Sequence, residues 1–267
     1  MPRNFWIEEE YKKDKCARAA RMILNAREIV YFTGAGIGTD SGIPDYRGIG
    51  SSHWTKYDLK DFVFDQFLRD EMGRREYWRM DEEFYDLVKT VQPNATHFAL
   101  AELEKMRKAH AIITQNVDGL HQRAGSSPEK VIEIHGNIFT VSCLQCFKKY
   151  SREEVSKLIK AGVDNPYCGF CRGILKSDTI SFGQPIVQAL SAKALMAALQ
   201  SNLFVVIGSS LLVQPAAYLV VKAKEAGSKV IIINLMATPY DMYADLVIYA
   251  NAQETMLKIM EKIKSSP

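Results

Sequence analysis

The chain has 267 residues, of which 47% are hydrophobic and 24% are charged, so it can form one large or two unequal globular domains and is not expected to be disordered. Its net charge of +3 is too small to predict a nucleic-acid or membrane-surface partner. The longest apolar runs, over 203–207 and 230–233, are far shorter than the roughly 18 residues of a membrane-spanning helix. Residues 1–10 contain three consecutive glutamates and resemble neither a secretory signal nor a transit peptide. We therefore expect an intracellular, cytoplasmic protein, with the nucleus not excluded.

Helices and short apolar runs alternate along the chain. An amphipathic helix is predicted over about 7–25, and a strand over 29–33 ends in a glycine-rich turn. Residues 49–91 contain aromatic residues spaced among charges, which predicts a helical insertion with its own small core. The next predicted elements are a helix from Asn94 or Thr96 to Lys108, strands over 111–114, 131–134, 203–207, 230–233 and 246–249, and helices over 191–200 and 216–225. Val- and Ile-rich strands alternating with helices predict a parallel sheet covered on both faces.

Small or polar residues follow five of the six predicted strands, where a parallel sheet forms its ligand crevice. Asn116 and Asp118 follow the second strand, and His135 follows the third. A histidine at this edge is a good candidate for a general base. His121 competes for that role, but it falls in a predicted helix and could equally pack in the interior.

The turn after the first strand begins like a dinucleotide-binding fingerprint. Residues 34–36 read Gly-Ala-Gly, which lets backbone N–H groups approach a pyrophosphate. The third glycine of the fingerprint would fall on Thr39, and Trp54 stands about 20 residues further on, where an acidic residue is expected. An ordinary dehydrogenase is therefore disfavoured. Asp45 and Arg47 add a carboxylate and a guanidinium beside the expected phosphates.

Four of the five cysteines form two close pairs, Cys143/Cys146 and Cys168/Cys171, separated by 21 residues. This spacing predicts a zinc site with four thiolate ligands. Four protein ligands leave no position for water, so the metal would stabilise a small ribbon rather than take part in a reaction. Redox and nucleic-acid-binding roles are alternatives for this segment. The fifth cysteine, Cys16, is expected to be structural or incidental.

Several motifs in one order resemble the sirtuin family of NAD-dependent protein deacylases. They are residues 34–37 with 41–47, 114–121 with 124–125, 135–137, the two cysteine pairs, 182–183, 208–211, 215–217 and 233–234. The resemblance covers about residues 15–260. It implies an α/β fold in which a Rossmann-like parallel-sheet domain (1–48, 92–139 and 179–267) carries a smaller domain made of a helical insertion and a zinc ribbon (49–91 and 140–178).

The resemblance also implies roles for individual residues. The catalytic group would be His135, the general base, with Asn116 and Asp118 at the nicotinamide end. The NAD-binding residues would be Gly34, Ala35, Gly36, Asp45, Tyr46, Arg47, Gln115, Asn116, Asp118, Gly208, Ser209, Ser210 and Asn234. The substrate-binding residues would be Phe182, Gly183 and Val213, and the structural zinc ligands Cys143, Cys146, Cys168 and Cys171. The implied partners are NAD and an acyl-lysine protein, with no membrane and no direct nucleic-acid binding, and the implied products are nicotinamide and O-acyl-ADP-ribose.

Four positions depart from the family pattern. Gly38, Tyr46, Ser177 and Gln184 replace the usual Ser, Phe, Pro and Glu, and none of these changes removes a catalytic group. The hydroxyl of Tyr46 is expected to affect the rate or base exchange. The Tyr-x-x-Arg pair of the desuccinylase branch is missing from residues 77–79, which favours deacetylation.

Two other functions remain open at this point. A protein mono-ADP-ribosyltransferase would use the same NAD site. A non-catalytic NAD-sensing or zinc-ribbon module would have no need of His135 at the nicotinamide end.

Overall fold

A six-stranded parallel sheet forms the centre of the larger part of the protein. The computed structural model describes residues 3–45 and 63–266. The strand order is β3-β2-β1-β7-β8-β9, and every neighbouring pair is parallel. The strands are β1 (Ile29–Thr33), β2 (Ala111–Thr114), β3 (Val131–Glu133), β7 (Leu203–Ile207), β8 (Lys229–Asn234) and β9 (Leu246–Tyr249). The order reverses between β1 and β7, as in a doubly wound dinucleotide-binding sheet, which confirms the predicted fold class.

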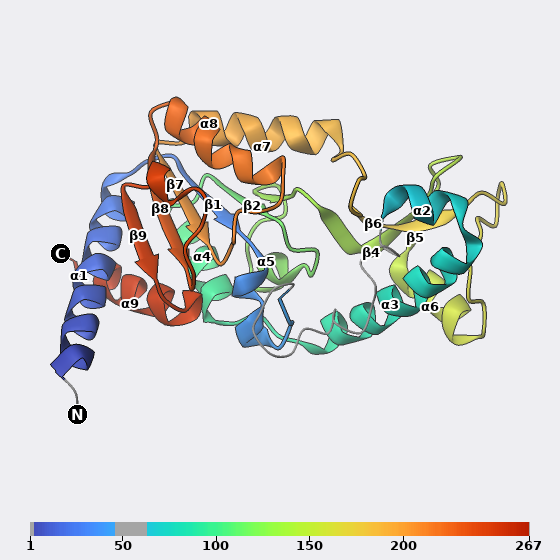
Figure 1. The fold of residues 1–267 in the computed structure, drawn as a ribbon, viewed down its shortest axis with the longest axis horizontal. Coiled ribbons are helices and arrows are strands. Elements are labelled where there is room, and N and C mark those ends of the chain that lie inside the picture. The colour runs from blue at the N-terminus through green and yellow to red at the C-terminus, as the bar shows by residue number, and fades with distance from the viewer. Residues whose placement is uncertain (1–2, 46–62, 267) are drawn as a thin grey trace.

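Helices cover both faces of this sheet (Figure 1). One layer contains α1 (Arg3–Asn25), α4 (Ala95–Lys105) and α9 (Ala252–Lys264), and the other contains α7 (Gln188–Gln200) and α8 (Leu219–Glu225). Successive residues of β1 face opposite layers, so Tyr31 packs in the core on the α1 side and Phe32 in the core on the α7 side. Burial on both faces explains why the central strands β1, β2 and β7 consist almost entirely of apolar residues.

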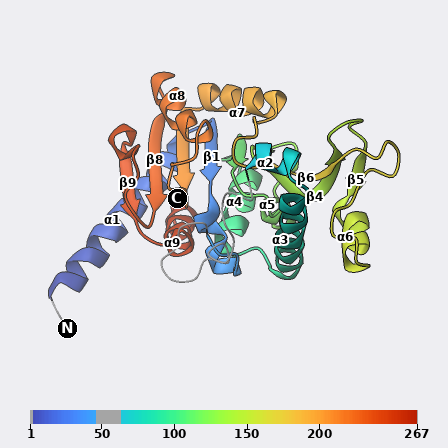
Figure 2. The same ribbon diagram turned by 45° about the vertical axis from the view of Figure 1, so that its right-hand side comes forward.

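The smaller part of the protein lies beside one end of the large sheet (Figures 1 and 2). Among the residues that the structure describes, it contains an antiparallel sheet, in the order β5-β4-β6, and three α-helices. These elements are β4 (Gly136–Cys143), β5 (Lys149–Ser151), β6 (Leu175–Thr179), α2 (Phe64–Arg69), α3 (Glu71–Thr90) and α6 (Arg152–Lys160).

The described part of the helical insertion, residues 63–91, shares its core with the ribbon, contrary to the expectation of a separate small core. Phe67 and Trp78 of the insertion pack in one cluster with Cys143 and Cys168 of the ribbon and with Val155 of α6. The short α2 and one face of α3 cannot enclose such large aromatic side chains without a partner layer, and the ribbon provides it. The described parts of the two segments therefore pack around one shared core.

Several element boundaries differ from the predicted ones. α1 begins at Arg3, α4 ends at Lys105 and α7 begins at Gln188. The stretch predicted as one helix over 216–225 is a 3₁₀ turn, Ala216–Tyr218, followed by α8.

Among the helices of the described residues, none combines the length and the apolar composition needed to cross a membrane.

Candidate active site

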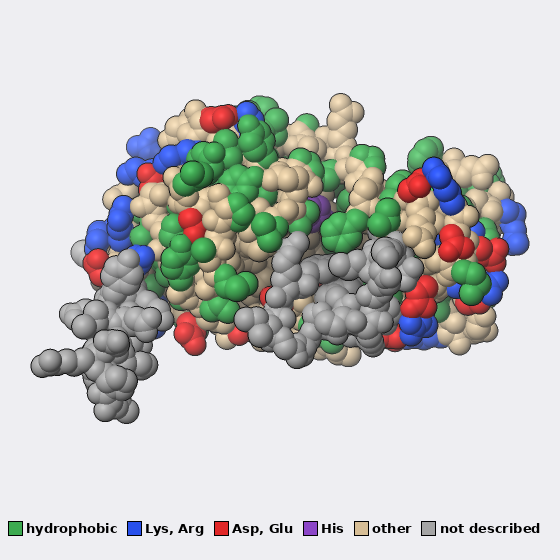
Figure 3. Space-filling model, in the orientation of Figure 1, with side chains coloured by type: hydrophobic (Ala, Val, Ile, Leu, Met, Phe, Trp, Pro, Cys, Tyr) green, Lys and Arg blue, Asp and Glu red, His purple; other side chains and the backbone are tan. Residues whose placement is uncertain are grey.

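A cleft of about 530 Å³ lies at the carboxyl ends of the central strands, between the large sheet and the smaller part. Figure 3 shows this hollow with a histidine side chain inside it. The predicted site residues that line it are Gly34, Ala35, Gly36, Asp45, Gln115, Asn116, His135, Phe182, Gly183, Gly208, Ser209, Ser210, Val213 and Asn234. Segments more than 150 residues apart in the chain thus meet at one edge of the sheet, as the strand-end argument predicts. Tyr46 and Arg47 lie outside the described residues.

Backbone segments touch where β1 and β7 end. The N–H of Gly36 donates to the carbonyl of Gly208 at 2.8 Å, and a Cβ on Gly36 would stand 2.9 Å from the Gly208 Cα. Gly208 itself has φ of +63°, which a residue with a side chain seldom adopts. These contacts require glycine at both positions. The turn lines the cleft at the point where the strand order reverses, the usual place for a dinucleotide pyrophosphate.

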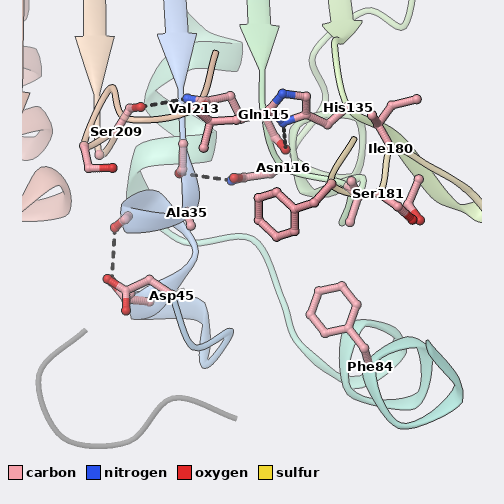
Figure 4. Close-up of a pocket in the computed structure, with 18 of the residues that line it drawn as sticks. Ala35, Asp45, Phe84, Gln115, Asn116, His135, Ile180, Ser181, Ser209 and Val213 are labelled. Carbon is pink, nitrogen blue, oxygen red and sulfur yellow. Dashed lines mark hydrogen bonds between the residues drawn. The ribbon is translucent and has the colours of Figure 1, made fainter. Parts of the chain in front are cut away.

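Two amide side chains after β2 connect the ends of three strands. Gln115 Nε2 donates to Ser209 Oγ at 2.7 Å, beyond β7, and Asn116 Nδ2 donates to the Gly34 carbonyl at 3.2 Å, beyond β1. Figure 4 shows both side chains below the strand ends, next to His135. Each amide is held by its own bond, so the polar edge of the cleft is ordered before any ligand binds.

His135 lies at the junction of the two sheets, in the turn between β3 and β4. Its Nδ1 is 3.2 Å from the Gln115 carbonyl oxygen. A carbonyl only accepts, so Nδ1 carries the proton and Nε2 has a free lone pair in the neutral ring. Burial lowers the pKa of His135 below its usual range, although the bond to Gln115 opposes this. The imidazole is therefore neutral at pH 7, as a base must be.

The turn that carries His135 is held tightly. The His135 carbonyl accepts the N–H of Ile180 at 2.8 Å, and Gly136 follows with φ of +75°. A Cβ on Gly136 would stand 1.7 Å from the Asp178 carbonyl, so only glycine fits. These constraints fix the backbone on both sides of the imidazole.

Asp118 and His121 are buried and are not among the residues that line the cleft. Asp118 Oδ1 accepts the N–H of Leu120 at the start of α5 (Leu120–Arg123), and burial raises the pKa of Asp118 to about 6. His121 Nε2 is 2.9 Å from Thr33 Oγ1, and burial lowers its pKa far below the usual value. His121 is thus packed in the interior, which was the alternative to its role as a base. Asp118 has a structural role at the start of α5 that the sequence did not indicate.

Replacing Asp118 by Asn tests whether this residue also acts at the nicotinamide end. An amide oxygen can still accept the Leu120 N–H, so we expect little change in melting temperature. Loss of the negative charge is expected to impair NAD use, measured as the KM for NAD and kcat/KM. Unaltered NAD kinetics would leave Asp118 with the structural role alone.

The sequence did not indicate one wall of the cleft, which α3 provides. Tyr77, Met80, Asp81 and Phe84 all line the cleft, and their positions, which follow the helical pattern i, i+3, i+4, i+7, place them on one face of the helix. Figure 4 shows the Phe84 ring across the cleft from the strand ends. The helical spacing was visible in the sequence, but nothing there connected this face with the distant strand ends.

The four paired cysteines meet in the smaller part of the protein. Their sulfur atoms all lie within 4.8 Å of one another, with Cys143 to Cys171 at 3.5 Å and Cys146 to Cys168 at 3.7 Å. A tetrahedral zinc ion with Zn–S bonds of about 2.3 Å needs sulfurs about 3.8 Å apart. The donor set and its spacing therefore fit one structural zinc ion.

The fold and the cleft define an α/β protein of the dinucleotide-binding class that carries a four-cysteine ribbon. Residues 34–215 match the model of the Sir2 family. The chain is 40% identical to an NAD-dependent protein deacetylase of Caldivirga maquilingensis, over 92% of this chain and 93% of the relative. It is 41% identical to another of that name from Sulfurisphaera tokodaii, over 94% and 97%.

Solved structures agree with this assignment. The structure described as "Sir2 bound to acetylated peptide" superimposes with a TM-score of 0.84 at 35% identity, over 93% of this chain and 98% of the other. "Sir2-p53 peptide-NAD+" gives a TM-score of 0.78 at 36% identity, over 93% and 98%. The chain therefore belongs to the Sir2 family, which confirms the predicted sirtuin resemblance and the prediction of an NAD-dependent enzyme with a cysteine metal site.

Proposed function

We propose that the protein removes acetyl or other acyl groups from lysine side chains of proteins by consuming NAD, with His135 as the general base. Relatives at 38–41% identity are named NAD-dependent protein deacetylase or deacylase. Two related solved structures are described as complexes with an acetylated peptide or with a peptide and NAD. The observation that carries the proposal is the neutral imidazole of His135, which lines the cleft and has its Nδ1 proton directed to the Gln115 carbonyl.

This chemistry proceeds in two stages. The acyl amide oxygen attacks the ribose carbon that bears nicotinamide, so that a C–O bond forms while the C–N bond to nicotinamide breaks. Nε2 of His135 then takes the proton of a ribose hydroxyl, which attacks the acyl carbon. The bond between the acyl carbon and the lysine nitrogen then breaks, the amine leaves with a proton, and water adds to the acyl carbon. The products are the free lysine side chain, nicotinamide and O-acyl-ADP-ribose. The ordered amides of Gln115 and Asn116 are suited to positioning the ribose and nicotinamide during these steps.

The other cleft residues have complementary roles in this proposal. The turn formed by Gly34, Ala35 and Gly36 binds the pyrophosphate, and Ser209 and Asn234 lie on the adenosine side. Phe182, Gly183 and Val213 border the entrance for acyl-lysine. Phe182 is 47% exposed, as suits a residue that touches an incoming protein segment.

Mass spectrometry of acetyl-lysine peptides incubated with labelled NAD tests the proposed reaction. Deacylated peptide together with labelled O-acetyl-ADP-ribose is the expected result. Label on the protein or peptide without loss of acetyl would instead identify a mono-ADP-ribosyltransferase, which the same NAD site could serve. The names of the relatives do not favour that second reaction.

The pH dependence of turnover follows from the lowered pKa of His135. The neutral form acts as the base, so kcat/KM should be level near pH 7 and above and should fall as the pH drops through a pKa below 6.5. Initial rates between pH 5 and pH 8.5 measure this profile. An acid limb centred above pH 7 would contradict a desolvated, neutral His135.

A further inference from the structure

The far wall of the cleft changes from apolar to polar along one face of α3. Met80 and Phe84 provide apolar surface, while Tyr77 and Asp81 provide a hydroxyl and a carboxylate, and all four line the cleft. All four residues are buried, and Tyr77 and Asp81, each 3% exposed, are the more enclosed pair, since Met80 and Phe84 are each 7% exposed.

This polar end lies close to the proposed base. Tyr77 Oη is 3.4 Å from Thr179 Oγ1, and Thr179 is the register partner of Gly136, the residue after His135. Thr179 also lines the cleft, directly before Ile180, whose N–H binds the His135 carbonyl. An acyl group held for reaction beside His135 therefore extends toward Tyr77 and Asp81.

Asp81 is held so that one of its oxygens is available. Its Oδ2 accepts from Ser177 Oγ at 2.7 Å and from Arg152 Nε at 3.0 Å. Within the described part of the chain, Oδ1 accepts no hydrogen bond. Ser177 is one of the departures from the family pattern, and its hydroxyl donates the shorter of these two bonds.

The charge of Asp81 is already compensated behind the cleft. Arg152 is fully buried between Asp81 and Glu82, with Nη2 donating to Glu82 Oε2 at 2.7 Å, and it does not line the cleft. Lys176 is also buried and directs its ammonium at the carbonyls of Ser177 and Thr179. An acidic acyl group would meet the Asp81 carboxylate rather than a free cation, whereas a neutral hydrogen-bond donor would meet an available acceptor.

From this arrangement we infer that Asp81 determines acyl specificity and favours acyl groups that carry a hydroxyl near their outer end over equally large aliphatic ones. The inference rests on the proposed deacylase function. Tyr77 and Thr179 supply further hydroxyls around the same position, and Met80 and Phe84 enclose the aliphatic part of the chain.

Matched peptides test this specificity. Acetyl-lysine, 3-hydroxybutyryl-lysine and 3-methylbutyryl-lysine peptides are compared, because the last two differ only by a hydroxyl in place of a methyl group; 2- and 4-hydroxyacyl peptides vary its position. We expect the wild-type kcat/KM to be about tenfold higher for the preferred hydroxyacyl peptide than for its methyl counterpart, the usual effect of one hydrogen bond to a charged group. In Asp81→Asn this ratio should fall at least threefold, because the charge on the acceptor is lost.

Ser177→Ala is the matched control, because it removes a bond to Asp81 Oδ2 without removing the carboxylate or any group of the cleft lining. It should lower the melting temperature and keep the hydroxyacyl preference. The ratio within each variant is independent of the folded fraction, so partial misfolding does not affect it.

Two results would overturn the inference: a wild-type ratio of one or less for every hydroxyacyl peptide, or the same ratio in Asp81→Asn as in wild type. If no acyl peptide is turned over, the proposed function fails. Calorimetric Kd values of the same peptides then still decide whether Asp81 selects the hydroxyl.

Discussion

Replacement of His135 by Ala is expected to lower deacylation of an acetyl-lysine peptide by about 10²- to 10⁴-fold, the usual effect of losing a positioned acid or base. The expectation rests on a ring that is neutral, faces the cleft and is held in one tautomer by the Gln115 carbonyl. NAD affinity, measured by calorimetry, should stay within a few fold. Nicotinamide release, which precedes the proton transfer, should fall less than deacylation.

His110→Ala is a suitable control for this experiment. His110 is a partly exposed histidine paired with Glu28 at the amino-terminal end of the sheet, opposite the cleft, and its loss should not change turnover. Near wild-type deacetylation by His135→Ala would mean that another base acts or that the reaction is a different one. His121 would then be the next residue to replace, although it is fully enclosed and bonded to Thr33.

Loss of zinc is expected to unfold the smaller part of the protein. Binding of a structural zinc ion contributes about 10–16 kcal/mol of apparent folding free energy in zinc-finger peptides at pH 7. The sulfurs of Cys143 and Cys168 also lie inside the hydrophobic cluster that joins the ribbon to α2 and α3. Metal analysis should find about one zinc per chain, and Cys143→Ala, Cys171→Ala or strong chelation should abolish the ordered near-ultraviolet dichroism of this part and cause aggregation.

Cys16→Ala is the control for these variants, because it removes a buried cysteine that is not a predicted zinc ligand. Cys16 is a residue of α1, is 2% exposed and packs in the core between α1 and the large sheet, whereas the other four cysteines lie in the smaller part. We expect this variant to keep its zinc and lose only a modest amount of stability. A metal-free preparation that stays folded and fully active would contradict a structural role for the metal.

The strands of the large sheet were predictable because most of their residues are buried between two helical layers and are therefore apolar. β6 was missed because its sequence, Leu-Lys-Ser-Asp-Thr, is mostly polar. Its Lys176 is nevertheless buried, with its ammonium bonded to backbone carbonyls, and Ser177 is buried against Asp81. Tertiary partners make such a strand stable, and local sequence does not reveal them. α9 was also missed, although its apolar residues recur with a helical period.

Much of the candidate site could be predicted because strand ends converge by topology alone. Gln115, Asn116, His135 and Ser209 line one cleft, as their positions after strands suggested. The α3 wall could not be placed, because no local pattern indicates which distant segment a helix faces. The burial of Asp118 could not be predicted either, because its carboxylate is enclosed by the start of α5 and not by the strand that precedes it.

Both connections between the two sheets pass directly beside His135. One is the turn from β3 to β4 that contains it, and the other runs from β6 through Ile180, whose N–H binds its carbonyl. The backbone that carries the imidazole is therefore tied to both sheets, through its own turn and through Ile180. We expect any displacement of the small sheet relative to the large one to change the direction of Nε2, even if no residue of the cleft is replaced.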